Sequence, residues 1–93
     1  MRLFYSPEAV GDLERLRSFL EEKNPQAARK AAATLINGIT QLKVFPLMGK
    51  EVPMAPDPQS VRDLVLGNYV VRYLVGDQEI YVLRIWHHKE ERP

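Results

Sequence analysis

The last third of the chain holds three β-prone runs joined by two very short turns. The runs are Val61–Leu66, Tyr69–Val75 and Glu79–Trp86. Gly67-Asn68, between the first two, is a two-residue hairpin signal with glycine at the first turn position. Gly76-Asp77 separates the second run from the third. Because turns this short join neighbouring antiparallel strands, residues 61–86 are predicted to form a three-stranded antiparallel sheet.

Two helices are predicted ahead of this sheet, each with a strong start signal. Ser6-Pro7 combines a serine N-cap with proline at the first helical position, and this helix is expected to end near Lys23. Asn24-Pro25 repeats the signal at once, so the second helix must fold back on the first as a hairpin. The apolar positions expected to face the core are Val10, Leu13, Leu16 and Leu20 in the first helix, and Ala28, Ala32, Leu35, Ile39 and Leu42 in the second.

The remaining segments complete a single α+β domain. Arg2–Tyr5 is a short β-prone run before the first helix, and Phe45-Pro46 ends the second. Residues 46–60 contain four prolines and one glycine and are expected to form a constrained loop. Since 93 residues leave no room for a second core, residues 1–93 are predicted to be one domain. Its expected architecture is an N-terminal β-strand and an α-helical hairpin packed on a C-terminal antiparallel sheet.

Side chains of the three strands fall into two sets, and both sets are largely apolar. With two tight hairpins, one face carries Arg62, Leu64, Leu66, Tyr69, Val71, Tyr73, Ile80, Val82, Arg84 and Trp86, and the other carries Val61, Asp63, Val65, Val70, Arg72, Leu74, Tyr81, Leu83, Ile85 and His87. The two helices can cover only one face, whereas the solvent face of an antiparallel sheet is normally polar. The second apolar face is therefore a candidate partner surface.

Composition and charge exclude several classes of function. The formal net charge is +1, from 13 basic and 12 acidic residues, so the total lacks the basic excess typical of nucleic-acid-binding proteins. There is no cysteine, hence no disulfide or thiolate chemistry. No apolar run reaches the roughly 20 residues that span a bilayer, and the N-terminus turns polar too soon for a signal peptide. A cytoplasmic protein is therefore expected. No metal or other cofactor is expected, because the sequence contains no phosphate loop and no metal-ligand cluster.

The two histidines, His87 and His88, follow the last strand directly. On an extended strand, adjacent side chains point in opposite directions, so only one of them could face a given site. This argues against a two-histidine metal centre. Solvation at a strand end explains both residues, although a single histidine could also act as a general base or bind a phosphate.

Three arginines lie inside the strands rather than at their ends. A mid-strand arginine needs a partner, because a buried unpaired charge is costly. In the first hairpin Arg72 stands opposite Asp63, which predicts a cross-strand ion pair. Arg62 and Arg84 are placed on the other face, where cation–π stacking on nearby tyrosines would account for them.

The order of several segments resembles a known protein family. These segments are the helical hairpin after a first strand, Phe45–Lys50, Val61–Leu64, Asn68–Tyr73 and Val82–His87. Together they resemble the RelE/ParE superfamily of bacterial type II toxins over nearly the whole chain. The resemblance implies the α+β fold described above. It also implies a cognate, ParD-like antitoxin whose C-terminal segment wraps the toxin, which would account for the second apolar face.

The superfamily has two branches with different targets. RelE-like members cleave mRNA on the ribosome, whereas ParE-like members poison DNA gyrase and are not nucleases. RelE-like chains carry an arginine where this chain has Val70, and paired lysines in the preceding strand, where this chain has only Arg62. No tyrosine follows His88. These departures favour a non-enzymatic, ParE-like toxin. Such a toxin is not expected by itself to bind nucleic acid directly in a sequence-specific way.

The resemblance assigns candidate site residues. The antitoxin is expected to bind either the apolar sheet face or a groove beside the helices, by strand or helix addition. On the sheet face its contacts are expected at Val61, Val65, Val70, Leu74, Tyr81 and Leu83. The gyrase contacts are expected at Arg84, His87, His88, Lys89 and Arg92, with no catalytic residue. In the alternative, a ribosome-dependent endoribonuclease, His87 or His88 would be the acid/base and Arg62, Arg84 and Arg92 the phosphate contacts. A third reading is a family member that pairs with its antitoxin but is not toxic.

Overall fold

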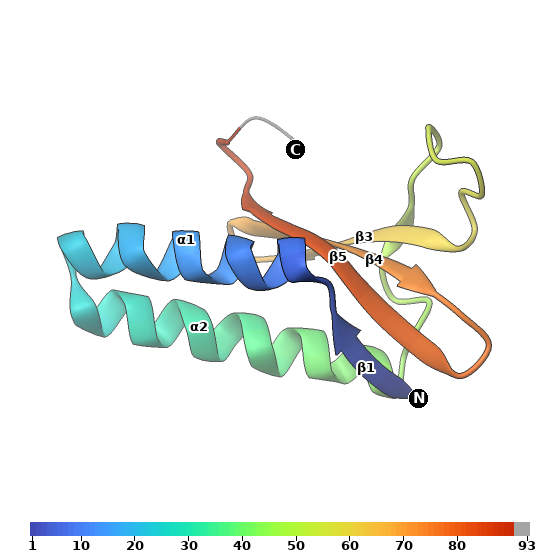
Figure 1. The fold of residues 1–93 in the computed structure, drawn as a ribbon, viewed down its shortest axis with the longest axis horizontal. Helices are drawn as coiled ribbons and strands as arrows, with labels where there is room; N and C mark the ends of the chain where they lie inside the picture. The colour runs from blue at the N-terminus through green and yellow to red at the C-terminus, as the bar shows by residue number, and fades with distance from the viewer. Residues whose placement is uncertain (91–93) are drawn as a thin grey trace.

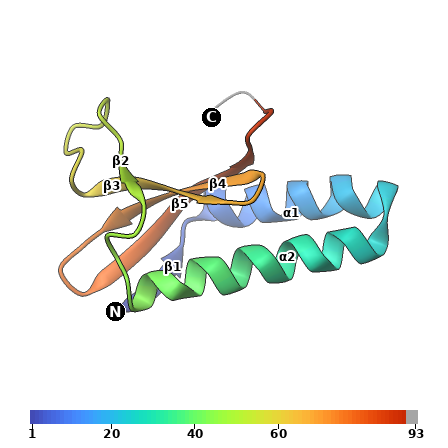
Figure 2. The same cartoon turned by 180° about the vertical axis from the view of Figure 1, so that it is seen from behind.

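The fold is a five-stranded mixed sheet with a helical hairpin on one side (Figures 1 and 2). It was obtained as a computed structural model that describes residues 1–90. The elements are β1 (Arg2–Tyr5), α1 (Pro7–Lys23), α2 (Pro25–Thr40), the 3-10 helix η1 (Gln41–Lys43), β2 (Lys50–Glu51), β3 (Val61–Leu66), β4 (Tyr69–Val75) and β5 (Glu79–His87). The strand order is β1-β5-β4-β3-β2, with β1 parallel to β5 and the other pairs antiparallel. The predicted α+β architecture is confirmed.

Both helices begin where their capping residues predict. The Ser6 hydroxyl accepts a hydrogen bond from the Ala9 N–H at 3.0 Å and thereby caps α1. Asn24 serves both helices: its N–H donates to the Leu20 carbonyl at the end of α1, and its side chain accepts from the first N–H groups of α2. Because a single residue ends one helix and starts the next, the two helices must pack as a hairpin.

The core lies between this hairpin and the sheet. In α2 the predicted stripe is correct, since Ala28, Leu35 and Ile39 are buried and Leu42 follows them in η1. In α1 the prediction is wrong at Val10, which is 43% exposed. The helix instead turns its small residue Ala9 and the carboxylate of Asp12 toward β5.

A β-bulge in β5 reverses the predicted alternation near the end of the sheet. Arg72 is paired with Arg84, but the next residue, Tyr73, is paired with Val82, so Leu83 is an extra residue. Beyond it, Ile85 faces the helices and is fully buried. The predicted faces are therefore wrong for Arg84, Ile85, Trp86 and His87, because strand parity assumed an uninterrupted ladder.

The sheet consequently has a helix face and an open face. We define the open face by the cross-strand registers as Val61, Asp63, Val65, Val70, Arg72, Leu74, Tyr81, Arg84 and Trp86. The loop between β2 and β3 projects on this side, away from the helices (Figure 1). Strand β2 itself was not predicted and pairs only with Arg62 and Asp63 of β3. Within residues 1–90, no helix is long and apolar enough to cross a membrane.

Candidate functional site: the open face and the C-terminal tip

The open face holds a charged pair surrounded by apolar side chains. Arg72 donates two hydrogen bonds to the Asp63 carboxylate, at 2.9 and 3.0 Å, which confirms the predicted cross-strand ion pair. The Arg72 guanidinium also lies 5.2 Å from the ring centroid of Trp86. These hydrogen bonds raise the pKa of Arg72. Both the charge and the planar face of this arginine are therefore occupied within the protein.

Arg62 is also occupied, but not by the expected cation–π stacking. Its guanidinium donates to the carbonyl oxygens of Gly49 at 2.9 Å and Gln59 at 3.1 Å, and it lies 3.7 Å from the carboxylate of Glu51. Arg62 thus ties the irregular segment on both sides of β2 to the sheet. The stacking prediction is wrong here because the loop supplies unpaired carbonyl oxygens, which attract a guanidinium more strongly than a ring does.

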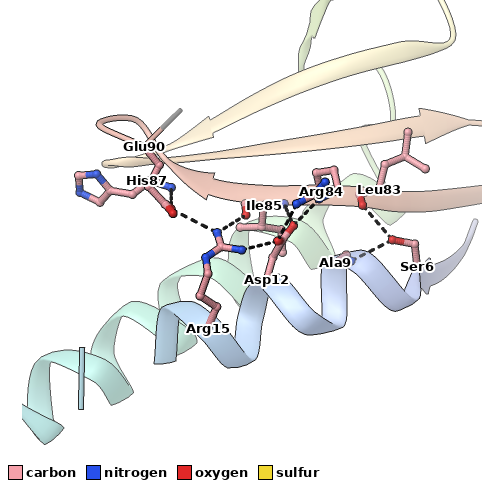
Figure 3. Close-up of polar contacts among 9 residues, drawn as sticks. All are labelled: Ser6, Ala9, Asp12, Arg15, Leu83, Arg84, Ile85, His87 and Glu90. Atoms are coloured by element: carbon pink, nitrogen blue, oxygen red, sulfur yellow. Dashed lines mark hydrogen bonds and ion pairs between the residues drawn. The ribbon is translucent and has the colours of Figure 1, made fainter. Parts of the chain in front are cut away.

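Arg84 reaches α1 instead of a tyrosine. Its guanidinium donates two hydrogen bonds to Asp12, at 2.9 and 3.1 Å, and Asp12 also accepts from the Ile85 N–H and from Arg15 (Figure 3). Burial alone would raise the pKa of Asp12, but the hydrogen bonds from Arg84, Ile85 and Arg15 outweigh it and lower that pKa. Sequence reasoning missed Asp12, whose only signal is a carboxylate on the apolar stripe of a helix.

The C-terminal tip consists of His87, His88, Lys89 and Glu90. The two imidazole rings stack with centroids 4.7 Å apart, so the expectation that they point in opposite directions is wrong. The strand ends at His87, and His88 lies in a turn where its Nδ1 is 3.1 Å from the Asn68 carbonyl oxygen. Glu90 accepts from the His87 N–H and from Arg15 and so holds the turn against α1 (Figure 3). Arg92 lies outside the described residues.

A groove of about 700 Å³ runs between α1 and this tip. It is lined by Arg15, Leu16, Phe19, Leu20, Lys23, Asn68, Tyr69, His87, Lys89 and Glu90. A groove beside the helices was predicted as an alternative antitoxin site, but its position between α1 and the tip was not. Phe19, which falls outside the predicted core stripe of α1 and is largely exposed, was the signal that could have indicated it.

The candidate antitoxin residues lie together on the open face, with one exception. Val61, Val65, Val70, Leu74 and Tyr81 share that face, and Val65 is 63% exposed. Leu83 is the extra residue of the bulge. Phe4 of β1 extends the surface, since its ring stacks on Tyr81 with centroids 5.4 Å apart. The sequence did not reveal Phe4 as a neighbour because the parallel β1–β5 pairing was not predicted.

The described residues contain no group of three or more side chains placed to hold a metal ion. A hollow of about 630 Å³ lies between the open face and the β2–β3 loop. Its lining includes Arg72 and Asp63, which are already paired with each other. Chemically, the surface offers apolar contacts around a neutralised ion pair.

Comparison with known proteins identifies the family. The model of the family "ParE toxin of type II toxin-antitoxin system, parDE" matches residues 3–92. Toxin RelE1 of Caulobacter vibrioides is 32% identical over 89 residues, covering 94% of this chain and 92% of the relative, and Toxin RelE2 of the same organism is 30% identical over 80 residues, covering 85% of each. A solved structure of a chromosomal ParDE toxin–antitoxin system from P. aeruginosa superposes with a TM-score of 0.75 and 26% identity over 94% of this chain and 95% of that one. With the helical hairpin, the sheet order and the family match in agreement, the chain belongs to the ParE toxin family of the RelE/ParE superfamily and is the toxin component of a type II toxin–antitoxin system.

Proposed function

We propose that this toxin is not an enzyme: it binds DNA gyrase, traps the cleaved-DNA state, and is neutralised by a ParD-like antitoxin. The observation that carries the proposal is the state of the arginines in β3, β4 and β5. Arg72 is bound to Asp63, Arg84 to Asp12, and Arg62 to loop carbonyls. All three cations already have partners within the protein.

Cleavage of RNA by its own 2′-hydroxyl makes specific demands on a protein surface. The charged phosphorane needs cations placed around it, and the leaving oxygen needs a proton donor. On this sheet Val70 stands where RelE-like chains carry arginine, and Asp63 neutralises the one arginine beside it. The open face therefore favours binding over phosphodiester chemistry.

The open face is the surface that we assign to the antitoxin. The proposed contact set consists of the open-face residues Val61, Val65, Val70, Leu74 and Tyr81, together with Leu83 of the neighbouring bulge. Burying Val65 and Tyr81 would remove exposed apolar area from water at about 25 cal/mol per Å². The ion pair of Arg72 and Asp63 at the centre would add specificity rather than affinity.

The gyrase contacts are proposed at the tip and the end of β5. The set is Arg84, His87, His88, Lys89 and Arg92. Lys89 and His88 are exposed in the turn that Glu90 holds against α1, so a target could reach them without unfolding of the sheet. This surface is separate from most of the open-face residues, which would let the antitoxin and the target make distinct first contacts.

Two assays with the purified toxin test the proposal. We expect inhibition of gyrase supercoiling with accumulation of cleaved DNA, and no codon-linked cuts when translated mRNA is analysed by primer extension. The double variant His88→Ala/Lys89→Glu should lose about tenfold or more of the gyrase inhibition, as expected for central contacts of an interface. Lys30→Glu, an exposed charge change on α2, serves as the matched control. Cuts in mRNA with normal supercoiling would reject the proposal.

A ribosome-dependent endoribonuclease is the second candidate, and the histidine pair at the tip favours it. A histidine can donate or accept a proton near neutral pH. The residues of this function would be His87 or His88 as acid/base and Arg62, Arg84 and Arg92 as phosphate contacts. It predicts codon-linked cuts that disappear in a His87→Ala/His88→Ala variant.

A further inference from the structure

The segment between η1 and β2 exposes four large apolar side chains. Val44, Phe45, Leu47 and Met48 are 70%, 60%, 61% and 41% exposed, and we call these four residues the apolar platform. The segment lies where α2 ends, near the N-terminus of the chain (Figure 2). Its residues line a shallow hollow of about 510 Å³. Single exposed apolar residues are normal on proteins, but four within five positions mark a contact surface.

Hydrogen bonds from the core hold the backbone of this platform in one shape. The hydroxyl of the fully buried Tyr73 donates to the Pro46 carbonyl and accepts from the Gly49 N–H, both at 2.8 Å. Arg62 donates to the carbonyls of Gly49 at 2.9 Å and Leu47 at 3.4 Å. Because this backbone is already ordered in the free toxin, binding a partner would cost the platform little conformational entropy. The exposure is thus a specified feature of the fold.

The rim of the platform is positively charged. The N-terminal ammonium of Met1 donates to the Lys43 carbonyl at 3.3 Å, and Lys43 directly precedes the segment. Lys50, which follows the segment, lies opposite Asp63 in the hollow of the open face. Neither lysine forms an ion pair within residues 1–90. The next carboxylate along the chain, that of Glu51, lies beside Arg62. A second copy of this chain would bring like charges together, whereas an acidic partner would be attracted.

We propose that the apolar platform docks an acidic, apolar segment of the antitoxin, at a site separate from the open face. A permanently exposed patch of this kind promotes aggregation, so the partner that occupies the toxin in its resting state should cover it. In a type II system that partner is the antitoxin. This inference rests on the family membership and not on the identity of the cellular target.

The location of the platform gives the antitoxin two points of attachment. Tyr73, which anchors it, belongs to the helix face of β4, so the platform lies toward the helix side of the sheet. An antitoxin bound to both surfaces would reach around the edge formed by β2 and β3. Two linked sites raise the overall affinity through a high effective concentration, without a large contact at either one.

The test measures the affinity of the purified cognate antitoxin for toxin variants. Phe45→Ser/Leu47→Ser should weaken binding by about 30-fold or more, the size expected for loss of an aromatic anchor. Ile36→Ser, on an exposed apolar residue of α2, is the matched control and should change the affinity little. Lys43→Gln should lower the salt dependence of binding, because one screened attraction at the rim is removed.

Measurements of growth inhibition and self-association distinguish three possible partners of the platform: the antitoxin, the cellular target and a second copy of the toxin. If the platform serves the antitoxin, Phe45→Ser/Leu47→Ser remains toxic and is poorly neutralised. Unchanged antitoxin affinity would overturn the inference, and if toxicity were lost at the same time, the platform would be assigned to the target. A wild-type toxin that dimerises in sedimentation experiments, with a monomeric variant, would show a self-interface instead. None of these outcomes depends on the gyrase assay.

Discussion

The carboxylate of Asp12 and the guanidinium of Arg84 are 72 positions apart in the chain and are joined by two hydrogen bonds of 2.9 and 3.1 Å. This contact lies where β5 loses its neighbour. Strand β1 pairs with β5 only as far as Val82. Beyond that point the edge of β5 would carry free N–H and C=O groups, which is costly at a packed helix–sheet junction.

Side chains of α1 take the place of the missing strand. Asp12 accepts from the Ile85 N–H at 2.8 Å, and Arg15 donates to the Ile85 carbonyl at 3.4 Å. The Ser6 hydroxyl donates to the Leu83 carbonyl at 2.8 Å (Figure 3). The first half of α1 therefore closes the sheet edge, which blocks strand addition there and directs partners to other surfaces.

Replacing Asp12 should destabilise the fold. In Asp12→Asn the negative charge is lost and one acceptor oxygen becomes an NH2 donor, which removes the ion pairs with Arg84 and Arg15. Hydrogen bonds to charged groups contribute about 1.5–3 kcal/mol. We expect a loss of that size in the free energy of unfolding, measured in urea. Glu14→Gln, an exposed acid on the same helix, is the control and should cost little. Equal effects of the two substitutions would contradict the assigned role of Asp12.

Acid should weaken the fold through the same carboxylate. The pKa of Asp12 is lowered from its ordinary value of 3.8, so the folded state binds fewer protons at this site than the unfolded state. Its stabilisation is complete above the unfolded pKa and is lost as the pH falls through the lower folded value. Urea midpoints measured between about pH 6 and pH 2 should fall more steeply for the wild type than for Asp12→Asn. Parallel curves would show that Asp12 does not titrate with folding.

Tyr73→Phe should loosen the apolar platform. The substitution leaves the Gly49 N–H without its hydrogen bond at a buried position, at a cost of about 1–3 kcal/mol. Faster hydrogen exchange of the Gly49 amide would report the effect locally. Tyr81→Phe removes a hydroxyl from an exposed ring and is the control. Unchanged exchange at Gly49 would mean that other contacts hold the loop.

Two glycines in the helices should respond in opposite directions to alanine. A Cβ at Gly38 would lie 2.6 Å from both δ-carbons of Leu66, so Gly38→Ala requires the Leu66 side chain to shift and should cost about 1 kcal/mol. A Cβ at Gly11 meets no atom within 4 Å, and Gly11→Ala should stabilise α1 by about 0.5–1 kcal/mol. Chemical denaturation of the two variants checks both signs. A neutral Gly38→Ala would show that the Leu66 side chain moves freely.

Short-range signals correctly predicted both α-helices, the strands β1, β3, β4 and β5, and one ion pair. Ser6 and Asn24 begin the helices as expected, because a cap involves only residues within one turn. Gly67 adopts a positive φ of 60° in the β3–β4 hairpin, and this turn sets the register that places Arg72 opposite Asp63. In these cases the interacting residues are close in the chain.

Predictions failed where distant segments meet. The bulge at Leu83, the stacked histidines and the partners of Arg62 and Arg84 depend on loops and helices far away in the sequence. From the sequence, the platform residues Phe45 and Leu47 were assigned only to a helix end and a loop. Their exposure became apparent only in the structure. Alternation patterns assume a regular ladder, and one extra residue reverses every side chain after it.

The order of capping residues, turns and apolar runs by itself determined the helical hairpin, the strands and the family resemblance, because each of these is encoded over a few neighbouring positions. Only the tertiary structure decided which cations remain available, which face is open and which loop is held rigid. Those properties depend on whether a charge or a carbonyl finds a partner across the fold, as Asp12 finds Arg84 and Tyr73 finds Gly49. Pairing of this kind depends on packing in three dimensions and cannot be predicted from neighbouring residues in the sequence.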